Sequence, residues 1–116
     1  MNRRVFSVAE TPFLTYDLDG PVQTEMSWLP ITYTKENPRG SYLMRMQPGA
    51  VTIEHVHPGY EEFLVLEGEL IEAGKPCKAG TVFTASAGVS HGPHETRTGC
   101  TVVFALSEQL DFVPVG

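Results

Sequence analysis

The four histidines of this chain fall into two short clusters, at positions 55–57 and 91–94. Side chains alternate faces along a strand, so His55 and His57 point the same way and their rings can meet at one metal ion. A Pro-Gly pair turns the chain directly afterwards, and Glu61 begins the next predicted strand, where its carboxylate can return beside the imidazoles. Imidazole and carboxylate together suit a divalent transition metal. The His-x-His pattern also fits two histidines on a solvent-exposed strand face.

The elements that must position these side chains are short strands. Six glycines in the second half of the chain are spaced by 8 to 12 residues, which is typical of turns in an antiparallel sandwich or barrel: Gly49, Gly59, Gly68, Gly80, Gly88 and Gly99. No long window has a 3.6-residue apolar period, so the only helix that we expect is one turn at 107–110. Strands are predicted at Phe13–Tyr16, Met26–Leu29, Ile31–Thr34, Ser41–Met46, Ala50–His55, Glu61–Glu67, Thr81–Ala85 and Thr101–Leu106.

Turn residues and apolar runs add detail to this pattern. We expect a turn at Asp19-Gly20-Pro21, and a second turn at Gly68 that separates a strand from its return strand. The segment Phe63–Leu66 is apolar on both faces. A strand of this kind must be covered on both sides, here by the barrel interior and by another layer or subunit.

Composition narrows the classes of function. The 116 residues fit one domain, residues 1–116, in which 1–27 form an N-terminal arm or edge strands. Eight basic residues are scattered among 14 acidic ones, and the net charge is −6. The chain therefore lacks the basic stripe that is typical of a nucleic-acid binder.

The longest apolar run, Val102–Leu106, is too short to span a membrane. The first residues lack the apolar stretch of a signal peptide, so we expect a cytoplasmic protein with reduced Cys77 and Cys100.

Residues 49–68 resemble the first motif of the cupin superfamily, G-x5-H-x-H-x3,4-E-x6-G, and every interval between the fixed residues matches. The fixed positions are held by Gly49, His55, His57, Glu61 and Gly68. Because only Glu61 leaves six residues before the glycine, the resemblance selects Glu61 as the carboxylate ligand. It also implies that Glu62 faces away from the metal.

Residues 80–95 resemble the second cupin motif, G-x5-P-x-G-x2-H-x3-N, with two departures. Both glycines and His91 are in register, whereas Ser86 replaces the proline and Glu95 replaces the asparagine. Both replaced positions are structural in the family, so the resemblance still implies one divalent metal ion: Fe, Zn, Ni or Mn. Its implied ligands are His55, His57, Glu61 and His91. The motif gives no role to His94, which we expect beside the ligands or at the pocket rim.

The resemblance covers residues 28–104 and implies an all-β fold, an antiparallel double-stranded β-helix, also called a cupin or jelly-roll barrel. The sequence is most similar to the cupin domain of zinc anti-sigma factors and to small dioxygenase cupins that act on β-diketones and related ketones. We therefore expect a metal-dependent, dioxygenase-like enzyme that acts on a small carbonyl-containing molecule. The alternatives are a zinc- or ligand-sensing module without catalysis, and an isomerase of sugars or other small molecules.

Inward side chains of the neighbouring strands are the candidates for a pocket beside the metal. Those candidates are Tyr33, Tyr42, Met44, Met46, Phe83 and Phe104, with Tyr60 in the turn at the mouth. The same side chains can equally fill the barrel core. The expected partners are a small-molecule ligand and a second copy of the chain in a homodimer, since a small barrel has strand edges to cover.

Overall fold

The computed structural model describes residues 3–16, 25–37, 39–52, 55–56, 59–90, 92–106 and 113–114. The regular elements among these residues are strands, and none of the described residues belongs to a helix long and apolar enough to cross a membrane. The strands are β1 (Leu14–Thr15), β2 (Met26–Pro30), β3 (Gly40–Met46), β4 (Val51–Thr52), β5 (His55–Val56), β6 (Glu61–Glu72), β7 (Lys75–Lys78), β8 (Val82–Ala85), β9 (His94–Glu95), β10 (Cys100–Leu106) and β11 (Val113–Pro114).

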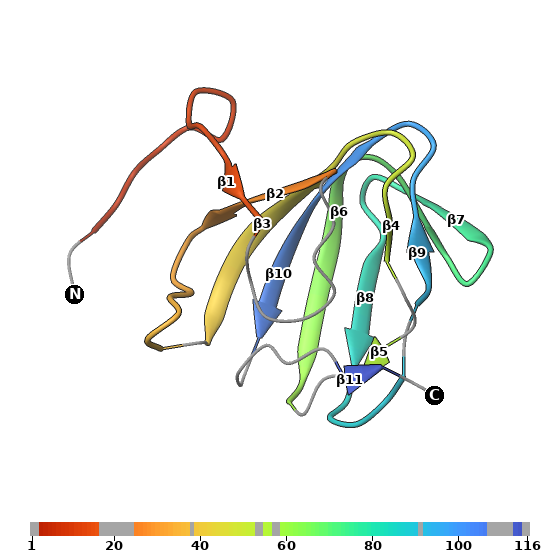
Figure 1. Cartoon of the computed structure of the whole chain (residues 1–116). Helices are drawn as coiled ribbons and strands as arrows, with labels where there is room; N and C mark the ends of the chain where they lie inside the picture. Colours follow the sequence, from red (N-terminus) through yellow and green to blue (C-terminus); the bar gives the residue numbers. More distant parts are fainter. Residues whose placement is uncertain are drawn as a thin grey trace.

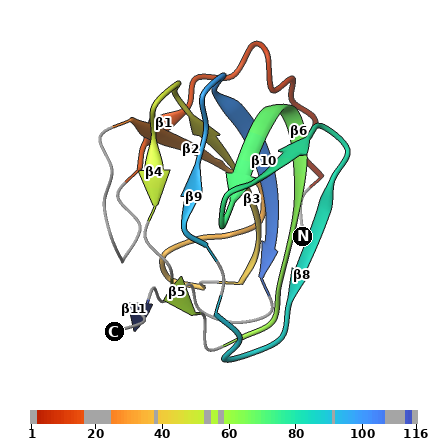
Figure 2. The same cartoon turned by 90° about the vertical axis from the view of Figure 1, so that its right-hand side faces the viewer.

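Nine of the described strands form one curled antiparallel sheet (Figures 1 and 2). Its neighbours run in the order β1-β2-β3-β10-β6-β9-β4, and β7 and β8 also pair with β6. The long strand β6 joins two layers, because its first half pairs with β10 and β8 and its second half with β7 and β9. A separate ladder pairs β5 with β11. The predicted all-β, antiparallel barrel is confirmed.

An aromatic ladder crosses the inner face of the barrel. Tyr42, Phe104, Phe63 and Phe83 are register partners on the adjacent strands β3, β10, β6 and β8. The rings of Tyr42 and Phe104 stack with centroids 5.0 Å apart, and those of Phe63 and Phe83 stack at 4.4 Å. Such aromatic pairs contribute about 0.5–1.5 kcal/mol each beyond their burial. The ladder therefore ties four strands together through side chains as well as backbone.

The turn that we predicted at Gly68 is wrong, because β6 continues through this residue to Glu72. Gly68 has a φ of +75°, and a Cβ added to it would collide with the carbonyl oxygen of Gly99. The glycine marks a close approach of two backbones instead of a reversal. The chain reverses five residues later, at Ala73-Gly74, where two residues of positive φ join β6 to β7.

A β-bulge at Leu66 changes which residues of β6 face the core. The pairing of β6 with β10 shifts by one residue here, so that Leu66 has no partner on β10 and is 41% exposed. Before the bulge, Glu61 and Phe63 point inward; after it, Leu70 and Glu72 occupy the inner face. An extra residue inverts the alternation of a strand, and this brings Glu72 to the same side as Glu61.

Two further strand predictions need correction. Residues 31–34 are not a strand, because their first three amides all donate to the carbonyl oxygen of Ser41, at 3.0 to 3.1 Å, and the chain coils around that acceptor. The predicted strand Ala50–His55 is divided between β4, which pairs with β9, and β5, which pairs with β11. The turn predicted at 19–21 and the helical turn at 107–110 lie outside the described residues.

The outer face of β6 is only partly covered within one chain. Leu64 is half-buried, and both Leu66 and Val82, the register partner of Leu64 on β8, are exposed. Over β3 the N-terminal segment lies on the outside, where the ring of Phe13 is 4.0 Å from the guanidinium of Arg45. Coverage of the remaining apolar side chains by a second copy of the chain stays a prediction.

Both cysteines are free thiols, as the sequence predicted. Cys77 lies on β7 and Cys100 begins β10, and both are buried. Burial raises the pKa of the Cys100 thiol to about 11, so this sulfur is protonated and unreactive at neutral pH.

We predict that Gly68→Ala destabilises the protein more than Gly74→Ala. Both glycines have positive φ, which costs an alanine about 1–2 kcal/mol, but only the Cβ at position 68 meets backbone atoms. The collision with Gly99 should add about 1–3 kcal/mol. Urea unfolding of both variants measures the difference, and equal losses of stability would contradict the close approach.

Candidate metal centre

Glu61, the carboxylate that the cupin motif selects, is buried, and the neighbouring Glu62 is exposed. Glu61 is the first residue of β6, pairs in register with Ala85 of β8, and is 1% exposed. Glu62 lies on the outer face, where its Oε1 accepts a hydrogen bond of 2.6 Å from the hydroxyl of Tyr60. The predicted orientation of the two glutamates is therefore observed, whereas metal ligation by Glu61 stays a prediction.

The backbone brings two of the predicted ligand segments to one end of the barrel. Figures 1 and 2 show β5, which begins with His55, at the same end as the start of β6 and the end of β8. The side chain of His55 and all of His57 and His91 lie outside what the structure describes. Among the side chains that it does describe, no group of three or more His, Cys, Asp or Glu is placed to hold a metal.

The chemistry of the donor set fits a divalent transition metal. Moving a carboxylate from water into a barrel interior is costly unless it is paired, hydrogen-bonded or bound to a metal. Glu61 is such a carboxylate, and the three predicted imidazoles would complete a mixed nitrogen and oxygen ligand set. The residues present are thus compatible with the predicted metal ion.

Two buried tyrosines feel the charge of Glu61, and a third tyrosine packs against one of them. Tyr16, which follows β1, and Tyr42 of β3 are both buried and are joined by a hydrogen bond. Tyr33 lies edge-on to Tyr42, with ring centroids 5.5 Å apart. Burial is the largest cause that raises the pKa of Tyr16 and of Tyr42, and the negative charge of Glu61 raises both further. Both hydroxyls therefore stay protonated at neutral pH.

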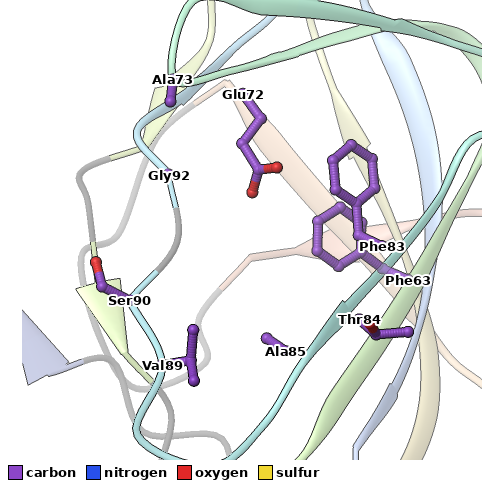
Figure 3. A pocket seen from close by; sticks show the side chains of 9 residues that line it. All are labelled: Phe63, Glu72, Ala73, Phe83, Thr84, Ala85, Val89, Ser90 and Gly92. Atoms are coloured by element: carbon purple, nitrogen blue, oxygen red, sulfur yellow. The ribbon is translucent and has the colours of Figure 1, made fainter.

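A pocket of about 290 Å³ opens beside this end of the barrel (Figure 3). One wall is the stacked pair Phe63 and Phe83, and Phe63 lies two residues after Glu61 on the same inner face. Ser90 and Gly92, the neighbours of the predicted ligand His91, form part of the opposite side. The volume is at the small end of the range for ligand sites, roughly 300–1,000 Å³.

Most of the predicted pocket residues fill the core instead of lining this pocket. Tyr33, Tyr42, Met44, Met46 and Phe104 are buried members of one hydrophobic cluster, and Phe83 alone among the candidates both packs against that cluster and lines the pocket. Tyr60 is exposed and bonded to Glu62 on the outside.

His94, which the motif left without a role, lies in a polar ladder next to the pocket. Thr52, His94 and Glu72 are register partners on the adjacent strands β4, β9 and β6. The Nδ1 atom of His94 is 3.1 Å from the hydroxyl oxygen of Thr52, and its Nε2 is 3.1 Å from Oε1 of Glu72. The ring also meets Phe63 edge-on, with centroids 5.8 Å apart. His94 is therefore buried behind the pocket wall, and its predicted role at the rim or beside the ligands stays a prediction.

Sequence reasoning missed two residues of this region. Strict alternation from Glu61 assigns Glu72 to the outer face, and only the bulge at Leu66 reverses that assignment. Tyr16 follows a two-residue strand in the N-terminal segment, and nothing in its spacing indicates that it enters the barrel. A signal existed only for Glu72, as a carboxylate placed directly before the Ala-Gly turn.

An antiparallel barrel that carries both motifs is the architecture of the cupins. More narrowly, the chain belongs to the ChrR cupin-like domain family, whose model matches residues 8–109. No curated protein shows significant similarity to the chain.

Solved structures with the same fold come from proteins of different functions. An acetylacetone dioxygenase from Acinetobacter johnsonii superposes with a TM-score of 0.67 at 14% identity, covering 91% of this chain and 75% of that one. An RmlC-like cupin from Shewanella frigidimarina gives 0.71 at 19% identity, covering 92% of each chain. Rhodobacter sphaeroides SigE in complex with the anti-sigma ChrR gives 0.62 at 21% identity, covering 86% of this chain and 51% of that one. Because these identities are low, the superpositions show a shared fold and no shared function.

The buried tyrosines predict a loss of stability in alkali. The unfolded chain ionises its tyrosines at about pH 10, whereas the raised pKa values keep Tyr16 and Tyr42 protonated in the folded state. Their contribution is complete below about pH 9 and is lost above pH 10, by about 1.4 kcal/mol per pH unit for each tyrosine. Tyr42→Phe should reduce the slope by that amount in urea unfolding between about pH 10 and 11.5. An unchanged slope would contradict the burial of this hydroxyl.

Proposed function

We propose that this protein is a metal-binding cupin and a metal-dependent, dioxygenase-like enzyme that acts on a small carbonyl-containing molecule. The observation that carries the proposal is the Glu61 carboxylate, which is buried in the barrel beside a pocket large enough for a small organic molecule. The four residues that would hold the metal are His55, His57, Glu61 and His91. When bound, the ion supplies Lewis-acid polarisation of a carbonyl group and, if it is iron, redox chemistry as well.

Around the proposed metal, the described residues supply an apolar wall for the substrate and polar groups in the barrel interior. Phe63 and Phe83 offer a flat apolar wall that excludes water and contacts the body of a small substrate. Glu61, Tyr16 and Tyr42 place one charge and two protonated hydroxyls in the interior. The shared fold with an acetylacetone dioxygenase supports the reaction class, at the level of fold analogy.

A second candidate is a zinc- or ligand-sensing module without catalysis. The observation that favours it is membership of the ChrR cupin-like family, together with the shared fold in the complex of SigE with the anti-sigma ChrR. The same metal and pocket would then report a bound ligand to a protein partner. The two candidates differ in whether the loaded protein turns over a substrate.

The proposed metal site predicts that substitutions of the adjacent Glu61 and Glu62 differ in their effect on metal binding. Glu61→Gln should weaken metal binding by at least about a hundredfold, because the loss of a ligand exceeds the 10–100-fold cost of losing an outer hydrogen-bond partner. Glu62→Gln, on the outer face, should leave the metal content unchanged. Elemental analysis of both purified variants measures this. Loss of the metal from Glu62→Gln alone would show that the ligand register is shifted by one residue.

Oxygen uptake distinguishes catalysis from sensing. Protein that has been loaded with iron(II) under anaerobic conditions should consume O₂ when acetylacetone or another small diketone is added, and Glu61→Gln should not. The control is the same iron concentration without protein. A metal-loaded protein that consumes no O₂ with any such ketone, but forms a stable complex with a sigma factor, would favour the sensing candidate.

Removal of the metal should lower the melting temperature without unfolding the chain. The aromatic ladder and the buried cluster around it form an apolar core whose members include none of the predicted metal ligands, so we expect the core to persist without the ion. Metal at about a hundred times its Kd adds roughly 2.7 kcal/mol to the native state. After chelation, circular dichroism should therefore retain a β-type spectrum and show a lower Tm. A random-coil spectrum would mean that the metal, not the core, determines the fold.

A further inference from the structure

The ladder formed by Thr52, His94 and Glu72 has no part in the predicted metal site, yet it ends at the pocket. The Glu72 side chain is 23% exposed and lines the pocket, where Figure 3 shows its carboxylate directed into the space beside Phe63 and Phe83. The His94 side chain behind it is only 8% exposed. Among the described residues that line the pocket, Glu72 alone has an ionisable side chain, and it lies next to the aromatic rings of Phe63 and Phe83.

Hydrogen-bond chemistry fixes the orientation of His94. An ionised carboxylate only accepts hydrogen bonds, so Nε2 of His94 carries a proton and donates it to Glu72. Nδ1 can then accept from the hydroxyl of Thr52 or, if it is protonated, donate to it, because a hydroxyl plays both roles. The imidazole therefore keeps both hydrogen bonds whether or not Nδ1 carries a proton. The edge contact with Phe63 restrains the plane of the ring.

The fixed imidazole in turn holds Glu72. Three register partners on three adjacent strands leave little freedom for the carboxylate to leave the pocket wall. A carboxylate can accept about four hydrogen bonds, so it can bind His94 and a ligand at the same time. Its acceptor-only character requires that the ligand bring the donor.

We propose that Glu72 is a ligand-binding residue that anchors the hydroxyl or N–H group of a small, flat molecule lying against Phe63 and Phe83. His94 is the positioning residue that holds the carboxylate in place. The class of ligand is a compact aromatic or conjugated molecule with one hydrogen-bond donor at its edge. This inference deepens the proposed function, on which it rests only in placing the ligand in the pocket next to the metal.

Phenol and anisole are a probe pair that differ in this one property. Both are flat and fit the pocket, but only phenol has a donor. Titration of zinc-loaded, ¹⁵N-labelled protein, followed by NMR chemical shifts, gives both dissociation constants. A hydrogen bond to a charged acceptor predicts that phenol binds about tenfold or more tightly than anisole.

The variants then assign that preference to Glu72 and His94. In Glu72→Leu the preference for phenol should vanish, while anisole still binds. The matched control Glu62→Leu, on the outer face, should keep the preference. His94→Leu should reduce the preference, and His94→Gln should restore most of it, because an amide N–H can replace the imidazole donor. A merely structural role of His94 would not produce that rescue.

Three outcomes would overturn the proposal: equal binding of the two probes by the unmodified protein, a preference that survives in Glu72→Leu, or binding shifts that fall outside the pocket. A surviving preference would indicate that phenol binds the metal instead. Zinc content measured on the same samples distinguishes a failure of this proposal from a failure of the proposed function. If the unmodified protein binds zinc but shows no preference for phenol, the role of Glu72 is contradicted. If the protein never binds zinc, the proposed function is contradicted.

Discussion

The burial of the Glu61 carboxylate inside an aromatic barrel is the constraint on which the rest of the molecule depends. A charge that is 1% exposed must be stabilised by partners within the interior, and the fold supplies an end of the barrel where such partners can converge. The strands β5 and β8 reach that same end (Figures 1 and 2). Buried tyrosine hydroxyls provide polar neighbours without adding a second charge.

Strand β6 connects this carboxylate to the pocket through one irregularity. Its first half carries the aromatic ladder of sheet neighbours that includes Phe63, and its second half carries the polar ladder that includes Glu72. The two ladders face the same interior because the bulge at Leu66 inverts the alternation between them. An unbroken strand would have turned Glu72 to the solvent and left the pocket without its carboxylate.

The sequence predicted the parts of this arrangement that depend on spacing. Turn intervals indicated the antiparallel barrel, and the motif register separated Glu61 from Glu62. The missed features depend on contacts between distant backbones: the approach of Gly68 to Gly99 and the bulge at Leu66 are not encoded in any local period. The entry of Tyr16 into the barrel likewise requires pairing of the N-terminal segment with β2, which residue spacing does not reveal.

The central claim, a metal held at the buried end of β6, is tested most directly by anomalous diffraction from crystals of the purified protein. Data collected on both sides of the absorption edges of iron, nickel, zinc and manganese locate and identify a bound ion. We predict one peak inside the barrel, about 2.0–2.2 Å from a carboxylate oxygen of Glu61. A barrel interior without a peak, or a peak bound elsewhere on the chain, would contradict the claim.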